Sequence, residues 1–192
     1  VVLPGFVSRN KNNDTTTLGR GGSDYTAALI ASALKADVLE IWTDVSGMYT
    51  ANPKLVKQAF PITEISYQEA MELSHFGAKV LYPPTVQPAL QKNIPIHIKN
   101  TFAPADEGTF ITKKSKDKKE PVKGISHIEN IALLTLEGNG MIGVPGFSKR
   151  LFSALSRSNI NVVLITQASS EHSICVGVYS ADAKKAKQIV DE

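Results

Sequence analysis

A run of charged residues without one apolar side chain constrains this chain more than any other feature. Residues 113–120 read Lys-Lys-Ser-Lys-Asp-Lys-Lys-Glu, and Pro121 follows. Such a run has nothing to bury in a core, so it is typical of an exposed linker. A basic tail for nucleic acid is the alternative, but aromatic residues are missing and acids are interspersed. We therefore expect one domain over 1–112, a linker over 113–121 and a second domain over 122–192.

The composition of the 192 residues is that of an ordinary folded protein, with 42% hydrophobic residues. The net charge is +3, and residues 113–120 account for all of it with five lysines against two acids. We therefore expect no nucleic-acid partner. No apolar run approaches the roughly 20 residues of a membrane span, so we expect no membrane association. The single cysteine, Cys175, excludes an internal disulfide and suits a cytoplasmic protein.

The first segment alternates β-rich runs with helical patterns, which predicts an α/β domain with a largely parallel sheet. A polar stretch at 9–17 predicts a loop or hairpin tip. A helix is expected over 23–34, with Ser23 as its N-cap and Asp24 in its first turn, where the helix dipole favours an anion. The other expected elements are strands at 1–8, 38–43 and 94–98 and helices at 67–74 and 85–92.

The second segment predicts the order strand, helix, strand, strand, helix. The strands are expected at 131–136, 162–166 and 174–179, a helix follows Gly146, and another covers 181–190. One more strand would complete a split βαβ sandwich. The chain also starts at Val1 without an initiating Met. We therefore expect a piece of a longer protein.

Residues 18–24, Leu-Gly-Arg-Gly-Gly-Ser-Asp, are the first candidate site. The glycines let the backbone approach a ligand, and the helix N-terminus behind them offers unpaired N–H groups to an anion. Arg20 adds a planar fork for a carboxylate or phosphate. A tight turn ahead of a capped helix is an equally good interpretation of these residues alone.

Residues 42–49, Trp-Thr-Asp-Val-Ser-Gly-Met-Tyr, are the second candidate site. They follow a predicted strand, and ligands of open α/β sheets bind beyond the carboxyl ends of strands. Thr43 and Asp44 would contact a nucleotide, Tyr49 would pack beside it, and Lys54 would meet a phosphate. On spacing alone, an ordinary surface loop is slightly favoured.

Three further features carry weaker signals. Lys79 lies in an apolar setting, where a phosphate ligand and a side chain reaching solvent are alternatives, the second being favoured. The four histidines share no short metal-binding spacing, so we expect no metal site made of protein ligands. A glycine turn at 143–146 ahead of a helix would bind the carboxylate of a small ligand, or would be only a turn.

Five motifs in this order closely resemble aspartate kinase. They are Leu-Gly-Arg-Gly-Gly-Ser-Asp-Tyr (18–25), Ile-Trp-Thr-Asp-Val-Ser-Gly-Met-Tyr (41–49), Glu-Leu-Ser-His-Phe-Gly-Ala-Lys-Val-Leu (72–81), Ile-Lys-Asn-Thr-Phe (98–102) and Leu-Ile-Thr-Gln-Ala-Ser-Ser-Glu-His-Ser-Ile (164–174). Pro-Val-Lys-Gly-Ile-Ser (121–126) is most similar to the branch in which a threonine-sensitive aspartokinase is fused to homoserine dehydrogenase. The resemblance covers essentially the whole chain.

The resemblance implies the carboxyl half of an amino-acid-kinase domain, an αβα sandwich, followed by an incomplete ACT domain of the ferredoxin-like α+β class. The implied reaction is phosphorylation of the side-chain carboxylate of L-aspartate by ATP with Mg²⁺, the first step towards threonine, lysine and methionine. Such transfer needs positioning and charge neutralisation. The chain alone is expected to be inactive, because the family's N-terminal lysine-containing glycine motif and acidic substrate residue have no counterpart here.

The resemblance also implies roles for individual residues. Asp24 would be catalytic, orienting an active-site lysine, and Arg20 and Ser23 would hold aspartate. The implied ATP site comprises Thr43, Asp44, Gly47, Tyr49, Lys54, Lys79 and Val80. The implied effector site, for threonine or lysine, comprises Gly146, Phe147, Ser148, Gln167 and Ser169. A second ACT domain would complete the effector site, in a homo-oligomer joined through ACT domains.

Two positions depart from the family pattern. Lys54 stands where the family commonly has arginine in Asp-Pro-Arg, so the charge remains but the bidentate fork does not. Tyr82 replaces a usual histidine. The alternative function is a non-catalytic regulatory chain that binds an amino acid and associates with a complete kinase.

Overall fold

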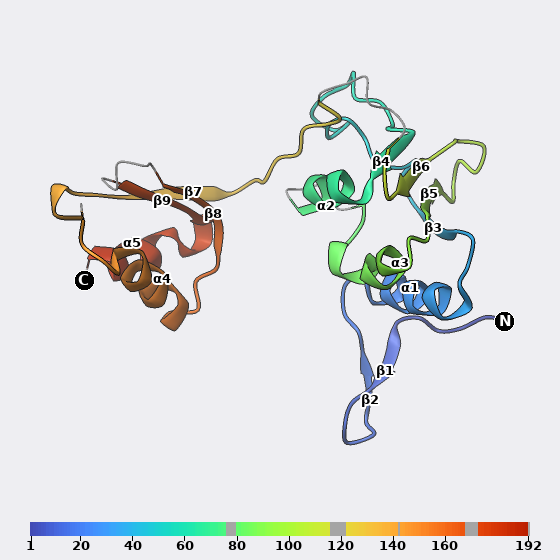
Figure 1. The fold of residues 1–192 in the computed structure, drawn as a ribbon, viewed down its shortest axis with the longest axis horizontal. Coiled ribbons are helices and arrows are strands. Elements are labelled where there is room, and N and C mark those ends of the chain that lie inside the picture. The colour runs from blue at the N-terminus through green and yellow to red at the C-terminus, as the bar shows by residue number, and fades with distance from the viewer. Residues whose placement is uncertain (76–79, 116–121, 142, 168–172, 192) are drawn as a thin grey trace. The chain divides into compact units, whose positions relative to one another are not determined.

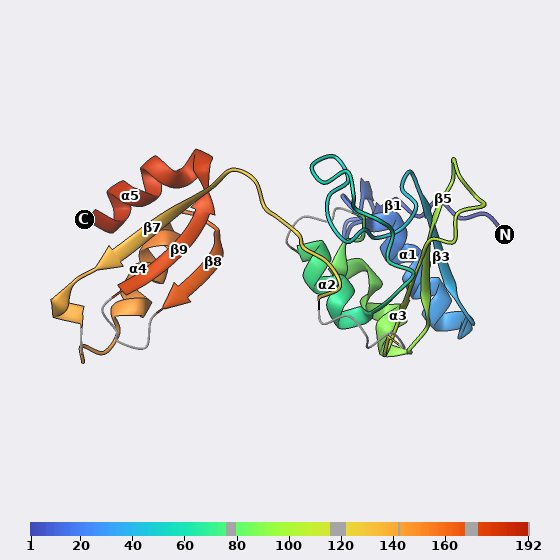
Figure 2. The same ribbon diagram turned by 90° about the horizontal axis from the view of Figure 1, so that it is seen from above.

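The protein is described from a computed structural model, which covers residues 1–75, 80–115, 122–141, 143–167 and 173–191. The chain forms two compact units, Val1–His127 and Ile128–Glu192, and each is described by itself (Figures 1 and 2). Residues after the lysine-rich run still contact the first unit, since the Ile125 N–H donates to the Thr50 carbonyl oxygen at 2.8 Å. The domain limits given above stay predictions.

The first unit begins with an antiparallel hairpin of β1 (Val7–Arg9) and β2 (Thr15–Thr17), which bears out the predicted tip. The prediction of a strand over 1–8 was wrong for residues 1–6. Pro4 has no N–H for a strand ladder, and the carbonyl of Gly5 accepts a hydrogen bond from Thr26 Oγ1 at 2.8 Å instead. This segment therefore lies against a helix rather than in a sheet.

A four-stranded mixed sheet forms the centre of the first unit. Its order is β3 (Leu39–Thr43), β5 (Ile96–Asn100), β6 (Thr109–Thr112) and β4 (Glu64–Ser66). The outer pairs are parallel, whereas β5 and β6 are antiparallel. The expected sheet was largely parallel. The connection over 101–108 is too short for the crossover that a parallel neighbour of β5 requires.

Helices cover one face of this sheet (Figure 1). They are α1 (Gly22–Leu34), α2 (Tyr67–His75), the 3₁₀ turn η1 (Pro83–Val86) and α3 (Gln87–Gln91). The predicted helix at 85–92 thus starts as a 3₁₀ turn on two prolines. Alternate strand residues point into the core beneath these helices, where the buried side chains include Leu39, Ile41, Ile65, Ile96, Ile98 and Ile111.

The second unit has the predicted order of elements. Its antiparallel sheet is β7 (Ile131–Glu137), β9 (Ser173–Tyr179) and β8 (Val162–Gln167). Short 3₁₀ turns, η2 (Asn139–Met141) and η3 (Ser180–Asp182), precede the helices α4 (Phe147–Arg157) and α5 (Ala183–Asp191). The core of this unit contains Met141, Leu151, Leu155, Ile160, Ile174, Val176, Val178 and Ala186.

Across the described ranges, every helix is too short or too polar to cross a lipid bilayer.

Candidate functional site

The loop ahead of α1 turns sharply at its glycines. Gly21 is the N-cap of α1 in the left-handed conformation (φ 72°), without a side-chain cap. The prediction of Ser23 as N-cap was therefore wrong: α1 begins at Gly22, one residue earlier, and Ser23 lies inside the first turn. Gly22 allows this geometry, since a Cβ there would lie 2.3 Å from the Cβ of Leu18.

Three polar side chains lie at the start of α1, one just before its N-cap and two in its first turn. Arg20 and Ser23 are exposed, and Asp24 is partly buried. Burial raises the pKa of the Asp24 carboxyl, and the Ser23 hydroxyl offsets part of that rise. The first N–H groups of a helix have no partner within it, so this turn can accept an anion beside the Arg20 guanidinium.

The loop after β3 contains the candidate nucleotide ligands. We define residues 43–49 as the nucleotide loop. Thr43 Oγ1 donates to Asp44 Oδ1 at 3.2 Å, and the carbonyl of Thr43 accepts the N–H of Thr101 at 2.8 Å. Gly47 has φ 110°, and a Cβ there would lie only 2.3 Å from Thr109 Oγ1. Only glycine fits this backbone so close to β6.

The chain beyond the nucleotide loop turns back on itself. Tyr49 is half-buried and forms an isolated antiparallel bridge with Pro61. Lys54 lies in an exposed turn, where its N–H donates to Asn52 Oδ1 at 3.0 Å. Val80 packs against the core of the first unit. Lys79 lies outside the described residues.

The two candidate sites lie at the same end of the first unit. Helix α1 has 13 residues and is about 20 Å long, and β3 has five residues and is about 17 Å long. The four residues 35–38 join them, so the chain reverses direction between them. The first turn of α1, with Arg20, Ser23 and Asp24, is thereby brought to the end of the sheet from which the nucleotide loop emerges.

The sequence did not reveal what supports the nucleotide loop. Ser46 Oγ donates to Asp106 Oδ2 at 2.5 Å and accepts from Asn100 Nδ2 at 2.9 Å. A hollow of about 310 Å³ lies beside them, lined by Ser46, Pro61, Thr63, Asp106, Glu107 and Gly108. The one available signal was Asn100 in the motif 98–102, the last residue of β5.

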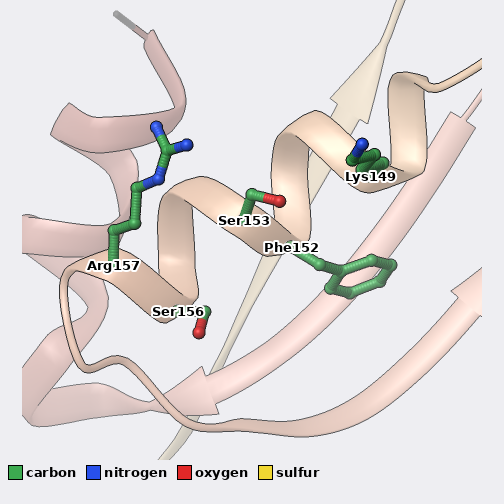
Figure 3. A pocket seen from close by; sticks show the side chains of 5 residues that line it. All are labelled: Lys149, Phe152, Ser153, Ser156 and Arg157. Atoms are coloured by element: carbon green, nitrogen blue, oxygen red, sulfur yellow. The ribbon is translucent and has the colours of Figure 1, made fainter.

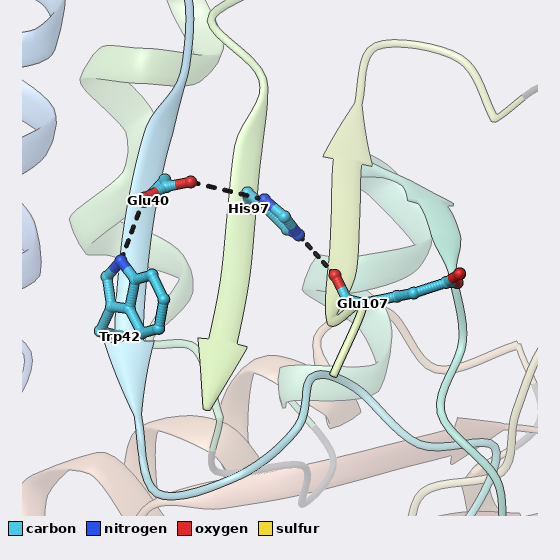
Figure 4. Close-up of polar contacts among 4 residues, drawn as sticks. All are labelled: Glu40, Trp42, His97 and Glu107. Atoms are coloured by element: carbon cyan, nitrogen blue, oxygen red, sulfur yellow. Dashed lines mark hydrogen bonds and ion pairs between the residues drawn. The ribbon is translucent and has the colours of Figure 1, made fainter. Parts of the chain in front are cut away.

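The face of the sheet opposite the helices anchors the same connection (Figure 4). His97 Nε2 contacts the carbonyl oxygen of Glu107 at 2.7 Å, and its ring stacks on Phe110 with centroids 3.7 Å apart. Glu40 Oε1 lies 3.8 Å from His97 Nδ1, and Glu40 Oε2 accepts from Trp42 Nε1 at 3.0 Å. These contacts fix the end of the 101–108 connection to β5.

The candidate effector residues of the second unit lie at one end of its sheet. Strands β7 and β8 both run antiparallel to β9, so their carboxyl ends lie at the same edge. Gln167 is the exposed last residue of β8, and Gly146 (φ 90°) is the N-cap of α4, which follows β7. Phe147 and Ser148 form the first turn of α4. Ser169 lies outside the described residues.

A different hollow of the second unit lies along α4, with a volume of about 400 Å³. Figure 3 shows Lys149 near one end of the lining stretch and Arg157 at the other. The lining residues are Lys149, Phe152, Ser153, Ser156 and Arg157. Of the candidate effector residues within the described ranges, none lines it.

Comparison with known proteins decides the family. A model of the amino acid kinase family matches residues 1–100, and an ACT domain model matches residues 134–192. The chain belongs to the amino acid kinase family. A bifunctional aspartokinase/homoserine dehydrogenase of Haemophilus influenzae is 49% identical over 187 residues, which are 96% of this chain and 23% of that protein.

Solved aspartokinases agree with this family assignment. Escherichia coli aspartokinase III in complex with aspartate and ADP (R-state) matches with a TM-score of 0.73 and 41% identity. The same enzyme in complex with lysine and aspartate (T-state) matches with a TM-score of 0.68 and 40% identity. Each match covers 91% of this chain and 38% of the other. The resemblance to aspartate kinase and the expected fold class are confirmed.

For this member of the amino acid kinase family, the comparisons do not reach individual site residues. The roles given to Asp24, Arg20 and the nucleotide loop therefore stay predictions. Among the described residues, no three His, Cys, Asp or Glu side chains gather as metal ligands would. The chain spans about a quarter of the length of the bifunctional relative.

Proposed function

We propose that this chain forms the nucleotide-binding and aspartate-binding end of an aspartokinase. The observation that carries the proposal is the connection of α1 to β3 by only four residues. It puts the open first turn of α1, with Arg20, at the end of the first unit where the nucleotide loop follows β3. The complexes of E. coli aspartokinase III with aspartate and with ADP support it, because that enzyme shares this fold at 41% identity.

Aspartate would bind at the start of α1. The Arg20 guanidinium would pair with a substrate carboxylate, while Ser23 and the unpaired N–H groups of the first turn donate hydrogen bonds to it. The backbone ahead of these donors is held in a tight turn, since the Gly22 N–H donates to the Gly19 carbonyl at 3.1 Å. A fixed donor set lowers the entropic cost of orienting a substrate.

Asp24 would organise the charged groups around the transferred phosphoryl group. Its carboxylate would orient a cationic side chain of the complete kinase rather than contact phosphate, which it would repel. Burial of Asp24 disfavours its charge, so an ionised Asp24 needs a cationic partner. This fits the role of an orienting residue.

ATP would lie against Thr43, Asp44, Gly47, Tyr49, Lys54, Lys79 and Val80. When bound, it supplies the γ-phosphoryl group that the substrate carboxylate accepts, and ADP leaves. Tyr49 is half-buried and offers a ring beside a base, and exposed Lys54 offers a charge to a phosphate. The described residues do not form a metal cage, so Mg²⁺ would be held chiefly by the nucleotide phosphates and waters.

The second unit would regulate the kinase by binding threonine or lysine. Gly146, Phe147 and Ser148 begin α4 at the edge where Gln167 ends β8. A second ACT domain would complete this site in a homo-oligomer. We further propose that the protein is cytoplasmic, with no nucleic-acid or membrane partner.

The isolated chain tests these proposals by two measurements. Calorimetry with ADP and Mg²⁺, threonine and lysine should show nucleotide binding, whereas a regulatory chain without kinase function would bind an amino acid and no nucleotide. A coupled assay should detect no aspartate-dependent release of ADP. Release of ADP by this chain would overturn its proposed inactivity, and failure of nucleotide binding would favour the regulatory alternative.

A further inference from the structure

The nucleotide loop has no secondary structure of its own between β3 and Tyr49, so other residues must hold its shape. Ser46, at its centre, is only 8% exposed. Its hydroxyl donates to Asp106 Oδ2 at 2.5 Å and accepts from Asn100 Nδ2 at 2.9 Å. The Ser46 hydroxyl gives its one hydrogen to Asp106, and its oxygen accepts the hydrogen bond from Asn100. The two partners together therefore fix the side-chain rotamer of Ser46.

The two partners of Ser46 are themselves held in place. Asn100 Oδ1 accepts the N–H of Phe102 at 2.9 Å, which orients the amide so that its nitrogen faces Ser46. The N–H of Asp106 donates to the carbonyl of Ala103 at 3.0 Å, which closes a turn within the 101–108 connection. The neighbouring Glu107 carbonyl contacts His97 on β5. The 101–108 connection is therefore held in its conformation by hydrogen bonds near both of its ends.

The second half of the nucleotide loop rests on the same support. Gly47 packs against Thr109, the first residue of β6, and the N–H of Met48 donates to Thr109 Oγ1 at 2.8 Å. The loop is thus held on both sides of Gly47, at Ser46 by Asp106 of the β5–β6 connection and at Met48 by Thr109 of β6. Of these contacts, only that of Asp106 brings a carboxylate, and hydrogen bonds to charged acceptors are about twice as strong as neutral ones.

We propose that Asp106 is a positioning residue for nucleotide binding. It does not touch the nucleotide; it holds Ser46, and thereby the backbone from Asp44 to Tyr49, in the shape that binds. This inference rests on the proposed function, because it gives a role to a residue behind the proposed ATP site. Nothing in the sequence pattern singles out Asp106, which lies 60 positions from its partner.

The test compares three variants of the 192-residue chain. Asp106→Ala removes the acceptor, whereas Asp106→Asn retains an oxygen that can accept from Ser46. Glu107→Ala is the matched control: it removes the adjacent carboxylate, which Figure 4 shows directed away from His97 while the backbone carbonyl makes the contact. The readouts are amide hydrogen exchange of residues 44–49 and the affinity for a fluorescent methylanthraniloyl derivative of ADP.

We expect D106A to speed exchange of residues 44–49 and to weaken ADP binding, each by about tenfold, the loss of one hydrogen bond to a charged group. D106N should stay within about threefold of the original chain because its amide oxygen accepts the same bond. E107A should match the original chain in both readouts. Exchange in the second unit, for example over β7, should not change in any variant.

Two outcomes would overturn the inference. One is unchanged exchange and unchanged affinity in D106A; the other is an increase in exchange over the whole first unit, which would give Asp106 a general structural role. If the original chain binds no ADP, the proposed function fails instead. The exchange of residues 44–49 then decides alone whether Asp106 holds the loop.

Discussion

Thr109 Oγ1 accepts a hydrogen bond at 2.8 Å from the N–H of Met48, a residue 61 positions earlier in the chain. Both residues are fully buried. The same hydroxyl donates to the carbonyl of Ile62 at 2.5 Å. One side chain on β6 therefore ties together the nucleotide loop and the segment that leads to β4. Such a contact stabilises the site without lying in it.

Replacing Thr109 by valine keeps the shape of the side chain and removes both bonds. The buried N–H of Met48 is then unpaired, so we expect a loss of about 1–3 kcal/mol in the free energy of unfolding of the first unit. Urea unfolding followed by the fluorescence of Trp42, the chain's one tryptophan, reports on that unit alone. T109S, which keeps the hydroxyl, should lose less than T109V, about 0.8 kcal/mol for one buried methyl group. Equal losses in T109V and T109S would contradict this account.

Helix α2 begins with a reciprocal capping box. The N–H of Ser66 donates to Glu69 Oε2 at 2.9 Å, and the N–H of Glu69 donates to Ser66 Oγ at 3.2 Å. The Ser66 hydroxyl also donates to Glu69 Oε2, and this bond is the main reason why the pKa of Glu69 is lowered. The ionised carboxylate therefore stabilises the folded state.

We expect E69A to lose about 0.5–2 kcal/mol of stability at pH 7. Because the pKa of Glu69 is lowered by folding, its contribution is complete above the ordinary glutamate pKa of about 4.3 and disappears as the pH falls through the lower folded value. Unfolding of E69A and of the control E72A, on the same helix with Glu72 exposed, would be compared at pH 7 and pH 3. A difference between E69A and the original chain that persists undiminished at pH 3 would refute this explanation.

Asp24 is expected to reduce stability in favour of function. Its pKa is raised by burial, so folding favours the protonated carboxyl and the charged form is disfavoured at pH 7. A hydrogen bond from the Ser23 hydroxyl lowers the pKa in part, but burial has the larger effect. Asp24→Asn should therefore stabilise the first unit at pH 7.

The pH dependence makes this prediction specific. The stabilisation by D24N should fade as the pH falls through the raised folded pKa, and should vanish below the ordinary aspartate pKa of about 3.9. Urea unfolding at several pH values measures it, with D37N at exposed Asp37 as the control. In the complete kinase, D24N should lower the turnover rate by about a hundredfold or more if Asp24 positions a catalytic cation. A D24N chain less stable than the original at pH 7 would show that the carboxylate is favourably paired.

The helices and strands of the second unit were predicted almost residue by residue, because each is long enough for the spacing of its apolar residues to be recognised. Phe147, Leu151 and Leu155 repeat at helical spacing, and β7 and β9 have seven residues each. In the first unit β4 and β6 have three and four residues, too few for alternation to stand out. These strands exist because β4 pairs with β6 and β6 pairs with β5, and the local sequence does not encode this pairing.

The sequence points to those parts of the candidate site whose residues are adjacent along the chain, and not to the residues that support them from a distance. The glycine-rich start of α1 and the nucleotide loop are continuous motifs, although Gly21 and not Ser23 caps the helix because a left-handed residue was needed there. Asp106 and Thr109 act on residues about 60 positions away, so no local pattern contained them.

The central claim is that a nucleotide binds at the loop after β3, beside an aspartate site in the first turn of α1. Titrating the ¹⁵N-labelled chain with ADP and Mg²⁺ and following backbone amide shifts by NMR tests it most directly. The account predicts the largest shifts in residues 43–49, with β7 and the residues along α4 unaffected. Aspartate added to the ADP-bound chain should then shift the first turn of α1. Shifts confined to the second unit, or no shifts at saturating ADP, would contradict it.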